Sequence, residues 1–256
     1  MSITLITVCK NAEATILDCL NSIKAQNYRN YEHLVIDGGS SDATIDIVKK
    51  NSPKSIIHIV DDDGLYDAMN IGMALSKGSI IGILNADDYL YDEDVFAAIA
   101  ESFDTHQVDC LYGDLIYVEN KATKKVVRKW KNYPMTADKF KSGWQPPHPT
   151  FYFQRAMYES YEGYDLNFKI AADFDLILRY LTKPGTRVLY LPKILVAMRM
   201  GGVSNRNLIS IWKSNCESIA ALRKNKIEFY RLPYLFRRLF PKLVDYVKQR
   251  AINLFQ

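Results

Sequence analysis

The chain has 256 residues, of which 48% are hydrophobic and 24% are charged, and its formal net charge is +4. These values are ordinary for a soluble globular protein, and the length suits one large domain, alone or with an appendage. The four cysteines (Cys9, Cys19, Cys110 and Cys216) include no C-x-x-C pair. The sequence therefore predicts neither a disulfide framework nor a cysteine zinc site, and it favours a reducing compartment.

The two ends of the chain differ in charge. We expect no signal peptide, because the first residues lack a basic segment ahead of an apolar stretch, and no apolar run approaches the ~20 residues of a membrane-spanning helix. Residues 221–256 contain nine Lys or Arg and two acidic residues, a local net charge of +7, which leaves about −3 for residues 1–220. Positive charge confined to the tail argues against a nucleic-acid-binding surface.

The first hundred residues alternate between strand and helix patterns, as βαβ units do. Strands are predicted at 3–9, 31–37, 55–60 and 79–84, and helices at 12–26, 42–50, 66–76 and 92–100. Each strand ends in a polar turn. The pattern predicts an α/β fold with a mostly parallel sheet, helices on both faces, and a ligand site at the carboxyl ends of the strands.

Beyond residue 108 the pattern changes. We expect antiparallel strands at 109–118 and 126–130, an irregular proline-rich segment at 144–149, a helix at 173–181, and strands at 187–191 and 195–200. A helix at 207–223 carries Ile209, Trp212, Cys216 and Ile219 on one face. We divide the chain into a catalytic domain at 1–204, with halves at 1–105 and 106–204, and a helical extension at 205–256.

The segment Asn85-Ala86-Asp87-Asp88 follows the fourth predicted strand. Adjacent carboxylates repel each other unless they are solvated or bridged by a cation, and hard oxygen ligands beside a phosphate suit Mg²⁺ or Mn²⁺. The alternative is a turn that caps the next helix. Residues 37–42 are a glycine-rich turn in which Asp37 could accept hydrogen bonds from a nucleoside, or they are only a turn; they are not a P-loop.

Three further side chains are candidates for function. Asp173 begins a helix, either as its cap or as a general base aimed at the ligand edge of the sheet. His148, between prolines, is either structural or a contact for a phosphate or an acceptor. Arg199 precedes two glycines, in a loop over a diphosphate or in an ordinary turn.

Five ordered motifs resemble those of family 2 glycosyltransferases. They are Ile6 to Ala12, Val35 to Asp42, Asp63 to Gly72, Asn85 to Asp88, and Ala172 to Arg179. The resemblance covers about residues 3–204 and implies a GT-A fold and inverting transfer of a sugar. Asn85 departs from the family pattern, because the family has an aspartate at this position, the first of its DxD motif.

The resemblance also implies roles for individual residues. Asp87 would bind the metal, Mg²⁺ or Mn²⁺, and Asp173 would be the catalytic base. The nucleotide and donor sugar would be held by Thr7, Val8, Asn11, Asp37, Gly39, Asp63, Gly64, Asp67, Asn70, Asn85, Asp88 and Arg199. UDP is the nucleotide that family habit favours, and His148 would contact the acceptor or a phosphate.

The tail suggests where the acceptor lies. Short helices are expected to begin at Pro233 and Pro241, and their basic, amphipathic pattern fits either an anionic membrane surface or packing on the catalytic domain. The membrane interpretation predicts a lipid-linked saccharide acceptor in surface polysaccharide assembly, such as O-antigen or capsule, and a cytoplasmic protein peripheral to the inner face of the membrane. Two alternatives stay open: a nucleotide-sugar-binding protein without turnover, and a nucleotidyltransferase.

Overall fold

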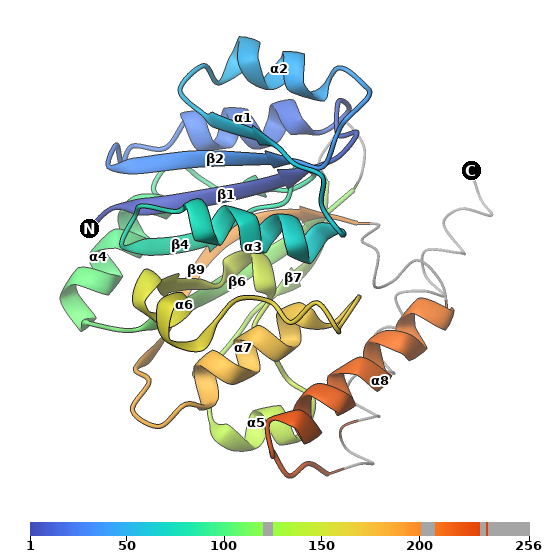
Figure 1. Ribbon diagram of the computed structural model, residues 1–256. Coiled ribbons are helices and arrows are strands. Elements are labelled where there is room, and N and C mark those ends of the chain that lie inside the picture. Colours follow the sequence, from blue (N-terminus) through green and yellow to red (C-terminus); the bar gives the residue numbers. More distant parts are fainter. Residues whose placement is uncertain (120–124, 201–207, 231–233, 235–256) are drawn as a thin grey trace.

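The computed structural model describes residues 1–119, 125–200, 208–230 and 234 (Figure 1). The predicted glycine loop after Arg199 and the predicted tail helices beginning at Pro233 and Pro241 lie outside these residues. No described helix is long and apolar enough to cross a bilayer.

The first half of the chain alternates strand and helix as predicted. Its strands are β1 (Ile3–Cys9), β2 (Tyr31–Asp37), β3 (Ile56–Ile59), β4 (Ile80–Ile83) and the short β5 (Tyr89–Leu90). Its helices are α1 (Ile16–Lys24), α2 (Thr44–Asn51), α3 (Leu65–Leu75) and α4 (Val95–His106).

The second half adds strands and helices of mixed direction. The strands are β6 (Cys110–Val118), β7 (Val126–Trp130), β8 (Tyr152–Gln154) and β9 (Val188–Arg199). The helices are α5 (Ala137–Lys141), a 3₁₀ turn η1 (His148–Thr150), α6 (Arg155–Tyr161), α7 (Ala172–Thr182) and α8 (Leu208–Lys224).

The described strands form one nine-stranded sheet in the order β3-β2-β1-β4-β8-β6-β9-β5, with β7 beside β6. Parallel pairing joins β3, β2, β1 and β4, as the βαβ pattern predicts, and it also joins β6 to β9. β8 enters antiparallel between β4 and β6 and joins the two halves of the sequence.

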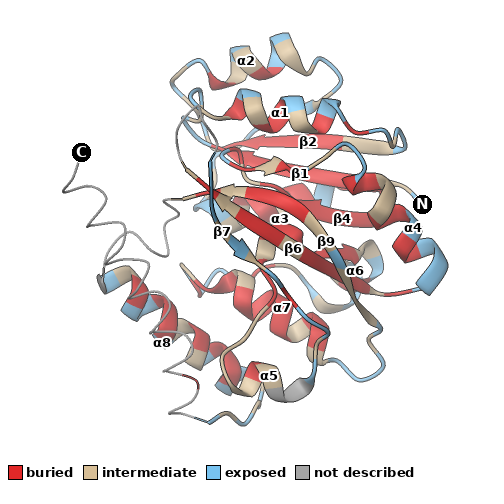
Figure 2. Cartoon of the chain, turned by 180° about the vertical axis from the view of Figure 1, so that it is seen from behind, coloured by how far each residue is buried: buried red, intermediate tan, exposed pale blue. Residues whose placement is uncertain are grey.

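Helices cover both faces of the sheet, which is why β1 is buried along its whole length (Figures 1 and 2). Because successive strand residues point to opposite faces, Ile3 and Leu5 pack with α1 and α4, whereas Ile6 and Val8 pack with α3 and α7. The elements that follow each strand are thereby fixed at the carboxyl edge of the sheet.

One predicted break in the chain is wrong: the two strands expected at 187–191 and 195–200 are the single strand β9. Pro192 lies between the two predicted strands, and proline donates no hydrogen bond to a ladder. β9 accommodates it in a bulge, since Tyr112 pairs with Tyr190 and Asp114 with Ile194, so that two steps along β6 match four along β9.

Three of the four residues on the predicted apolar face of α8 are exposed, and only Ile219 packs against the core. Ile209 and Trp212 are 67% and 66% exposed, and Cys216 is also exposed. The buried side of the helix instead carries small and polar side chains together with a few apolar ones: Ile211, Ser214, Asn215, Ser218, Ala221 and Leu222.

Candidate functional site

The loops that follow β1 and β2 are joined by hydrogen bonds at the carboxyl edge of the sheet. Asn11 is in the left-handed conformation at φ 52°. Its side-chain Oδ1 accepts a hydrogen bond from the backbone amide of Ser41 (2.8 Å), and its backbone amide donates to Ser40 Oγ (2.8 Å). Asp37 is 1% exposed, and its Oδ1 accepts the amides of Gly39 and Ser40 (3.0 and 2.8 Å). The Asp37 carboxylate therefore shapes the glycine loop in this structure.

Two residues predicted to contact the nucleotide lie beneath the surface. The Thr7 side chain is fully buried, and its Oγ1 shares a hydrogen bond with His33 Nε2 (2.9 Å), whose Nδ1 faces Ser55 Oγ (2.7 Å). Val8 packs into the core against α3. Long-range packing directs both side chains inward, so a nucleotide contact at these two predicted positions would be made by their backbone.

The loop between β3 and α3 lies against the glycine turn. A Cβ atom on Gly38 would lie 2.5 Å from Asp62 Oδ2, so the two loops are in close contact and a larger residue at 38 would displace the Asp62 side chain. Gly64 has φ 118°, and the Asp67 carboxylate accepts the amide of the exposed Asp63 (3.1 Å). These contacts place the predicted donor loop, 63–67, beside the predicted nucleoside loop.

Asn70, a predicted donor contact, has a structural role in this structure. Its Nδ2 donates to the Tyr164 carbonyl (2.9 Å), and its Oδ1 accepts the Tyr164 amide (2.7 Å). Because both ends of the amide are engaged, Asn70 joins α3 to the loop that carries Tyr164.

The turn Asn85 to Asp88 follows β4 and combines an exposed carboxylate with a buried one. Asp87 is exposed as a residue, but desolvation raises the pKa of its carboxyl. Asp88 is 1% exposed, and its burial, reinforced by the charge of Asp87, raises its pKa well above the usual range. Asn85 Oδ1 is buried without a hydrogen-bond partner among the described residues. An unsatisfied oxygen next to a carboxylate suits a hard cation.

The described residues contain no group of three His, Cys, Asp or Glu side chains that could hold a metal. A cation bound here would thus take Asp87 and the Asn85 amide oxygen from the protein, with water and a diphosphate supplying the remaining ligands. The residues fit a site of that kind, in which the substrate completes the coordination.

Arg199, predicted as a phosphate contact, is 6% exposed at the end of β9. Its backbone amide donates to Asp88 Oδ1 (3.1 Å), and its guanidinium donates to the Asp87 carbonyl and forms an ion pair with Asp18 of α1. These contacts fix the turn that carries Asp87, so Arg199 supports the site by holding that turn from its buried side.

Asp173 lies at the start of α7, close to the donor loop. Its Oδ1 accepts the Phe174 amide (2.8 Å) and lies 3.4 Å from the hydroxyl of Tyr66, at the start of α3. The same hydroxyl donates to the Ile170 carbonyl (2.7 Å). From α8, Glu217 Oε2 accepts the amides of Ile170 and Ala171 (2.8 and 2.9 Å). Groups from two distant helices thus hold the turn that positions Asp173.

His148 lies in the same cluster as Asp173. Its Nε2 shares a hydrogen bond with the Tyr164 hydroxyl (2.6 Å), and the Tyr164 ring stacks on that of Tyr66. Burial lowers the pKa of His148, and the negative charge of Asp173 opposes that shift, which places the two groups within electrostatic reach. The structure thus brings His148 and Asp173 together, although 24 residues separate them in the sequence.

Three residues of this cluster were not singled out from the sequence: Tyr66, Tyr164 and Glu217. Tyr66 lies within the motif 63–70, so the sequence alone could have indicated that it belongs to the site. Tyr164 and Glu217 lie in segments without a motif, and only their packing reveals them.

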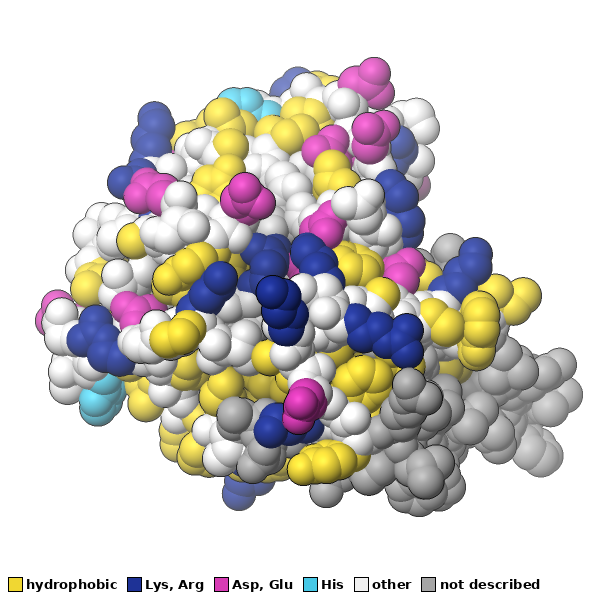
Figure 3. Space-filling view, turned by 60° about the horizontal axis from the view of Figure 1, so that its bottom comes forward, with side chains coloured by type: hydrophobic (Ala, Val, Ile, Leu, Met, Phe, Trp, Pro, Cys, Tyr) yellow, Lys and Arg dark blue, Asp and Glu magenta, His cyan; other side chains and the backbone are white. Residues whose placement is uncertain are grey.

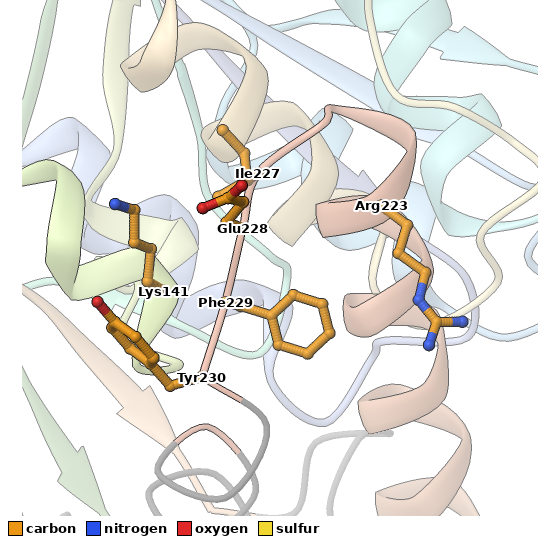
Figure 4. Close-up of a pocket in the computed structure, with 6 residues that line it drawn as sticks. All are labelled: Lys141, Arg223, Ile227, Glu228, Phe229 and Tyr230. Carbon is orange, nitrogen blue, oxygen red and sulfur yellow. The ribbon is translucent and has the colours of Figure 1, made fainter.

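A pocket of about 410 Å³ lies elsewhere, between α5, the end of α8 and the segment that follows it (Figure 4). Its lining combines cationic and apolar side chains: Lys141, Arg223, Ile227, Glu228, Phe229 and Tyr230. None of the predicted site residues lines it.

Comparisons with known proteins agree with the motifs. The family model described as glycosyl transferase family 2 matches residues 4–163. A PGL/p-HBAD biosynthesis glycosyltransferase of Mycobacterium bovis is 30% identical over 201 residues, 76% of each chain. An uncharacterized glycosyltransferase of Mycobacterium tuberculosis is 31% identical over 185 residues, 70% of this chain and 68% of the relative.

Solved structures share the fold. S. aureus TarS 1–349 superposes with a TM-score of 0.65 at 18% identity, over 87% of this chain and 65% of that one, so this chain matches just under two thirds of its length. The mannosyltransferase PcManGT of Pyrobaculum calidifontis, in complex with GDP-Man and Mn²⁺, gives 0.61 at 17% identity, over 98% of this chain and 75% of that one. The GT-A fold expected from the motifs is confirmed. The extent of the family match, together with relatives that share three quarters of the chain, establishes that this protein belongs to glycosyl transferase family 2.

Proposed function

We propose that the protein is an inverting glycosyltransferase that moves a sugar from a UDP-sugar to a hydroxyl of a lipid-linked saccharide during the assembly of a surface polysaccharide. The observation that carries the proposal is the position of Asp173: the hydroxyl of Tyr66, which lies in the donor loop at the start of α3, joins the turn before Asp173 to that loop. A carboxylate held at that junction reaches a hydroxyl that approaches the donor sugar.

In the proposed reaction, Asp173 accepts the proton of the acceptor hydroxyl while that oxygen attacks the anomeric carbon and the nucleoside diphosphate leaves. His148 is neutral at neutral pH, because burial lowers its pKa, and can therefore accept or donate a hydrogen bond to the acceptor. A single displacement inverts the anomeric centre, so an α-linked donor yields a β-linked product, which NMR of the product detects.

On the donor side, Asp87 and Asn85 would hold the divalent cation, Mg²⁺ or Mn²⁺. When bound, the cation would neutralise the charge that develops on the departing diphosphate. Asp88 and Arg199 keep the turn in place through their mutual hydrogen bond. The loops at 37–41 and 63–67 would contact the nucleoside and the sugar, largely through backbone groups, since the Asp37 carboxylate is already engaged.

The choice of UDP is supported by the related fold of TarS, which has been solved in complex with UDP-GlcNAc, whereas PcManGT binds GDP-Man. The decisive experiment measures donor hydrolysis and transfer across UDP-, GDP- and dTDP-sugars with Mn²⁺ and with EDTA. We expect release of one nucleoside diphosphate that requires the metal and is lost in Asp87→Ala.

Asp104→Ala is the matched control, because this carboxylate is exposed on α4, on the opposite face of the sheet from α7. Tight UDP binding without turnover of any donor would replace the proposal with a nucleotide-sugar-binding protein. Release of diphosphate from a nucleoside triphosphate would replace it with a nucleotidyltransferase.

A further inference from the structure

The outer face of α8, defined by Ile209, Trp212, Lys213 and Cys216, is a surface without an assigned role. These residues lie on successive turns and are exposed, Ile209 to 67% and Trp212 to 66%. Large exposed apolar side chains are ordinary when scattered, but here two lie one turn apart on a helix at the edge of the molecule, beside α7 (Figure 1). A partner that covers such a surface lowers the free energy, because apolar side chains are removed from water.

The charge of α8 is arranged unevenly around the helix. Its basic residues Lys213 and Arg223 are exposed, whereas Lys224 pairs with Asp165 and with Asp175 of α7. Its one acidic residue, Glu217, is engaged with the amides of Ile170 and Ala171 on the inner side. The outer face therefore combines apolar side chains with positive charge.

The sequence that follows α8 has the same sign of charge. Residues 225–256 contain seven Lys or Arg and two acidic residues, a net charge of +5. Figure 3 shows the face that comes forward from the bottom of Figure 1, where Lys and Arg side chains lie among hydrophobic ones, with several Asp and Glu side chains between them. Tryptophan next to lysine is the combination that favours the headgroup region of a bilayer, where the ring is buried and the ammonium meets anionic lipid.

We propose that the outer face of α8 docks on an anionic lipid bilayer, with Trp212 and Ile209 inserted among the headgroups. The inference rests on the proposed lipid-linked acceptor and names the surface through which the enzyme reaches it. Docking through α8 would place the bilayer one helix away from Asp173, because Glu217 on the inner side of α8 holds the turn before α7. A lipid-linked saccharide would then enter from the side on which the base lies.

A second copy of this chain fits the same surface less well. Three apolar side chains over two helical turns offer far less than the ~800 Å² per partner of a standard interface. A protein partner also gives no reason for the lysine and arginine excess, whereas an anionic bilayer matches it.

The test is flotation of the full-length protein with vesicles of phosphatidylcholine alone and of equimolar phosphatidylcholine and phosphatidylglycerol. We expect binding to the anionic vesicles that weakens as salt rises. The double variant Ile209→Ser/Trp212→Ser should bind these vesicles about tenfold or more weakly, since burial of each side chain contributes at least about a factor of ten to the affinity. The basic tail is present in both proteins, so the difference reports on α8. Leu17→Ser, 42% exposed on α1, is the matched control and should bind like wild type.

Cys216 provides a second measurement that does not depend on the double variant. The other three cysteines are buried, so an environment-sensitive fluorophore reacts at Cys216. Its emission should shift to the blue with anionic vesicles only. Equal flotation of wild type and the double variant, or no shift of the label, overturns the proposal, and a dimer in solution whose Cys216 thiols cross-link would assign the face to a second copy. Donor hydrolysis without vesicles is measured in parallel, so loss of docking and loss of the proposed reaction are separable.

Discussion

Asp173 is held by residues from two other parts of the chain: Tyr66 of α3 approaches its carboxylate, and Glu217 of α8 holds the turn that precedes it. A base that is fixed before the acceptor arrives loses no further entropy in the reaction. The placement of one side chain in α7 therefore depends on α3 and α8, which precede and follow it in the sequence.

We predict that Asp173→Asn folds and binds UDP like wild type but lowers kcat by roughly 10²–10⁴-fold, because the amide cannot accept the proton of the acceptor. Turnover is measured by release of nucleoside diphosphate in the presence of acceptor, and UDP binding by calorimetry. Turnover close to wild type would assign the base to another residue, with His148 the next candidate.

At this scale the sequence identified the motifs but not the contacts of their side chains. Asp87 and Asp173 were identifiable because their motifs recur in order along the chain. The inward orientation of Thr7 depends on His33, 26 residues away, and the engagement of Asn70 depends on Tyr164, 94 residues away. No local pattern contains these partners, so the sequence alone did not reveal how the Thr7 and Asn70 side chains are engaged.

Among the elements, α7 and α8 act as a pair. Asp175, fully buried one turn after the start of α7, forms an ion pair with Arg179 (2.7 Å) and accepts Asn225 Nδ2 (3.0 Å) from the end of α8, and Lys224 lies 3.3 Å away. A buried carboxylate with this many donors is stabilising only while all of them remain paired.

We predict that Asp175→Ala lowers the free energy of unfolding by roughly 3–5 kcal/mol, because it leaves the Arg179 charge without its partner in the interior. Urea denaturation monitored by circular dichroism gives the value. The exposed pair of Arg155 and Glu159 is the comparison: Glu159→Ala should cost about 0–1 kcal/mol, and similar losses in both variants would contradict the assigned role of Asp175.

Glu217 should behave as a positioning residue for the reaction. Glu217→Ala removes the acceptor of two amides next to Asp173, so we expect kcat to fall by about tenfold while the KM for donor and the affinity for UDP stay unchanged. Glu217→Gln, which keeps one acceptor oxygen, should recover part of kcat. Parallel losses in kcat and UDP affinity would show that the whole fold is disturbed instead.

The elements themselves were largely predictable, because their hydrophobic periods are long and regular. β1 and β2 have the predicted bounds, and the parallel order of the first four strands follows from the βαβ pattern. β9 and α8 were less predictable. A bulge in β9 accommodates Pro192, and the packed side of α8 includes Ser214, Asn215 and Ser218, which carry no hydrophobic signal.

For the whole molecule, the buried His33 couples stability to pH. Burial lowers its pKa from 6.5 to about 4, so the folded state binds this proton more weakly than the unfolded state does. The contribution of neutral His33 to the free energy of unfolding is complete above pH 6.5. It declines as pH falls toward 4, by at most about 1.4 kcal/mol per pH unit. His148 acts in the same direction, whereas the raised pKa of Asp88 acts against it.

We therefore predict that the free energy of unfolding of wild type falls between pH 7 and pH 5 by more than that of His33→Gln, in which this side chain carries no proton to bind. Urea denaturation at both values gives the comparison, and His106→Gln, an exposed change on α4, is the control. Equal pH dependence in wild type and His33→Gln would mean that His33 is not the group responsible.

The insertion of β8 between β4 and β6 sets an order of events on the ribosome. β4 receives its second neighbour only when Tyr152–Gln154 has been made, roughly 70 residues after Ile83. At about 5–20 residues per second, the apolar edge of β4 stays open for on the order of 3–14 s after its synthesis. Throughout that interval the nascent parallel sheet offers unpaired backbone groups to any other emerging strand. Chaperone binding to ribosome-bound chains should accordingly peak after residue 83 has emerged and fall once β8 has followed.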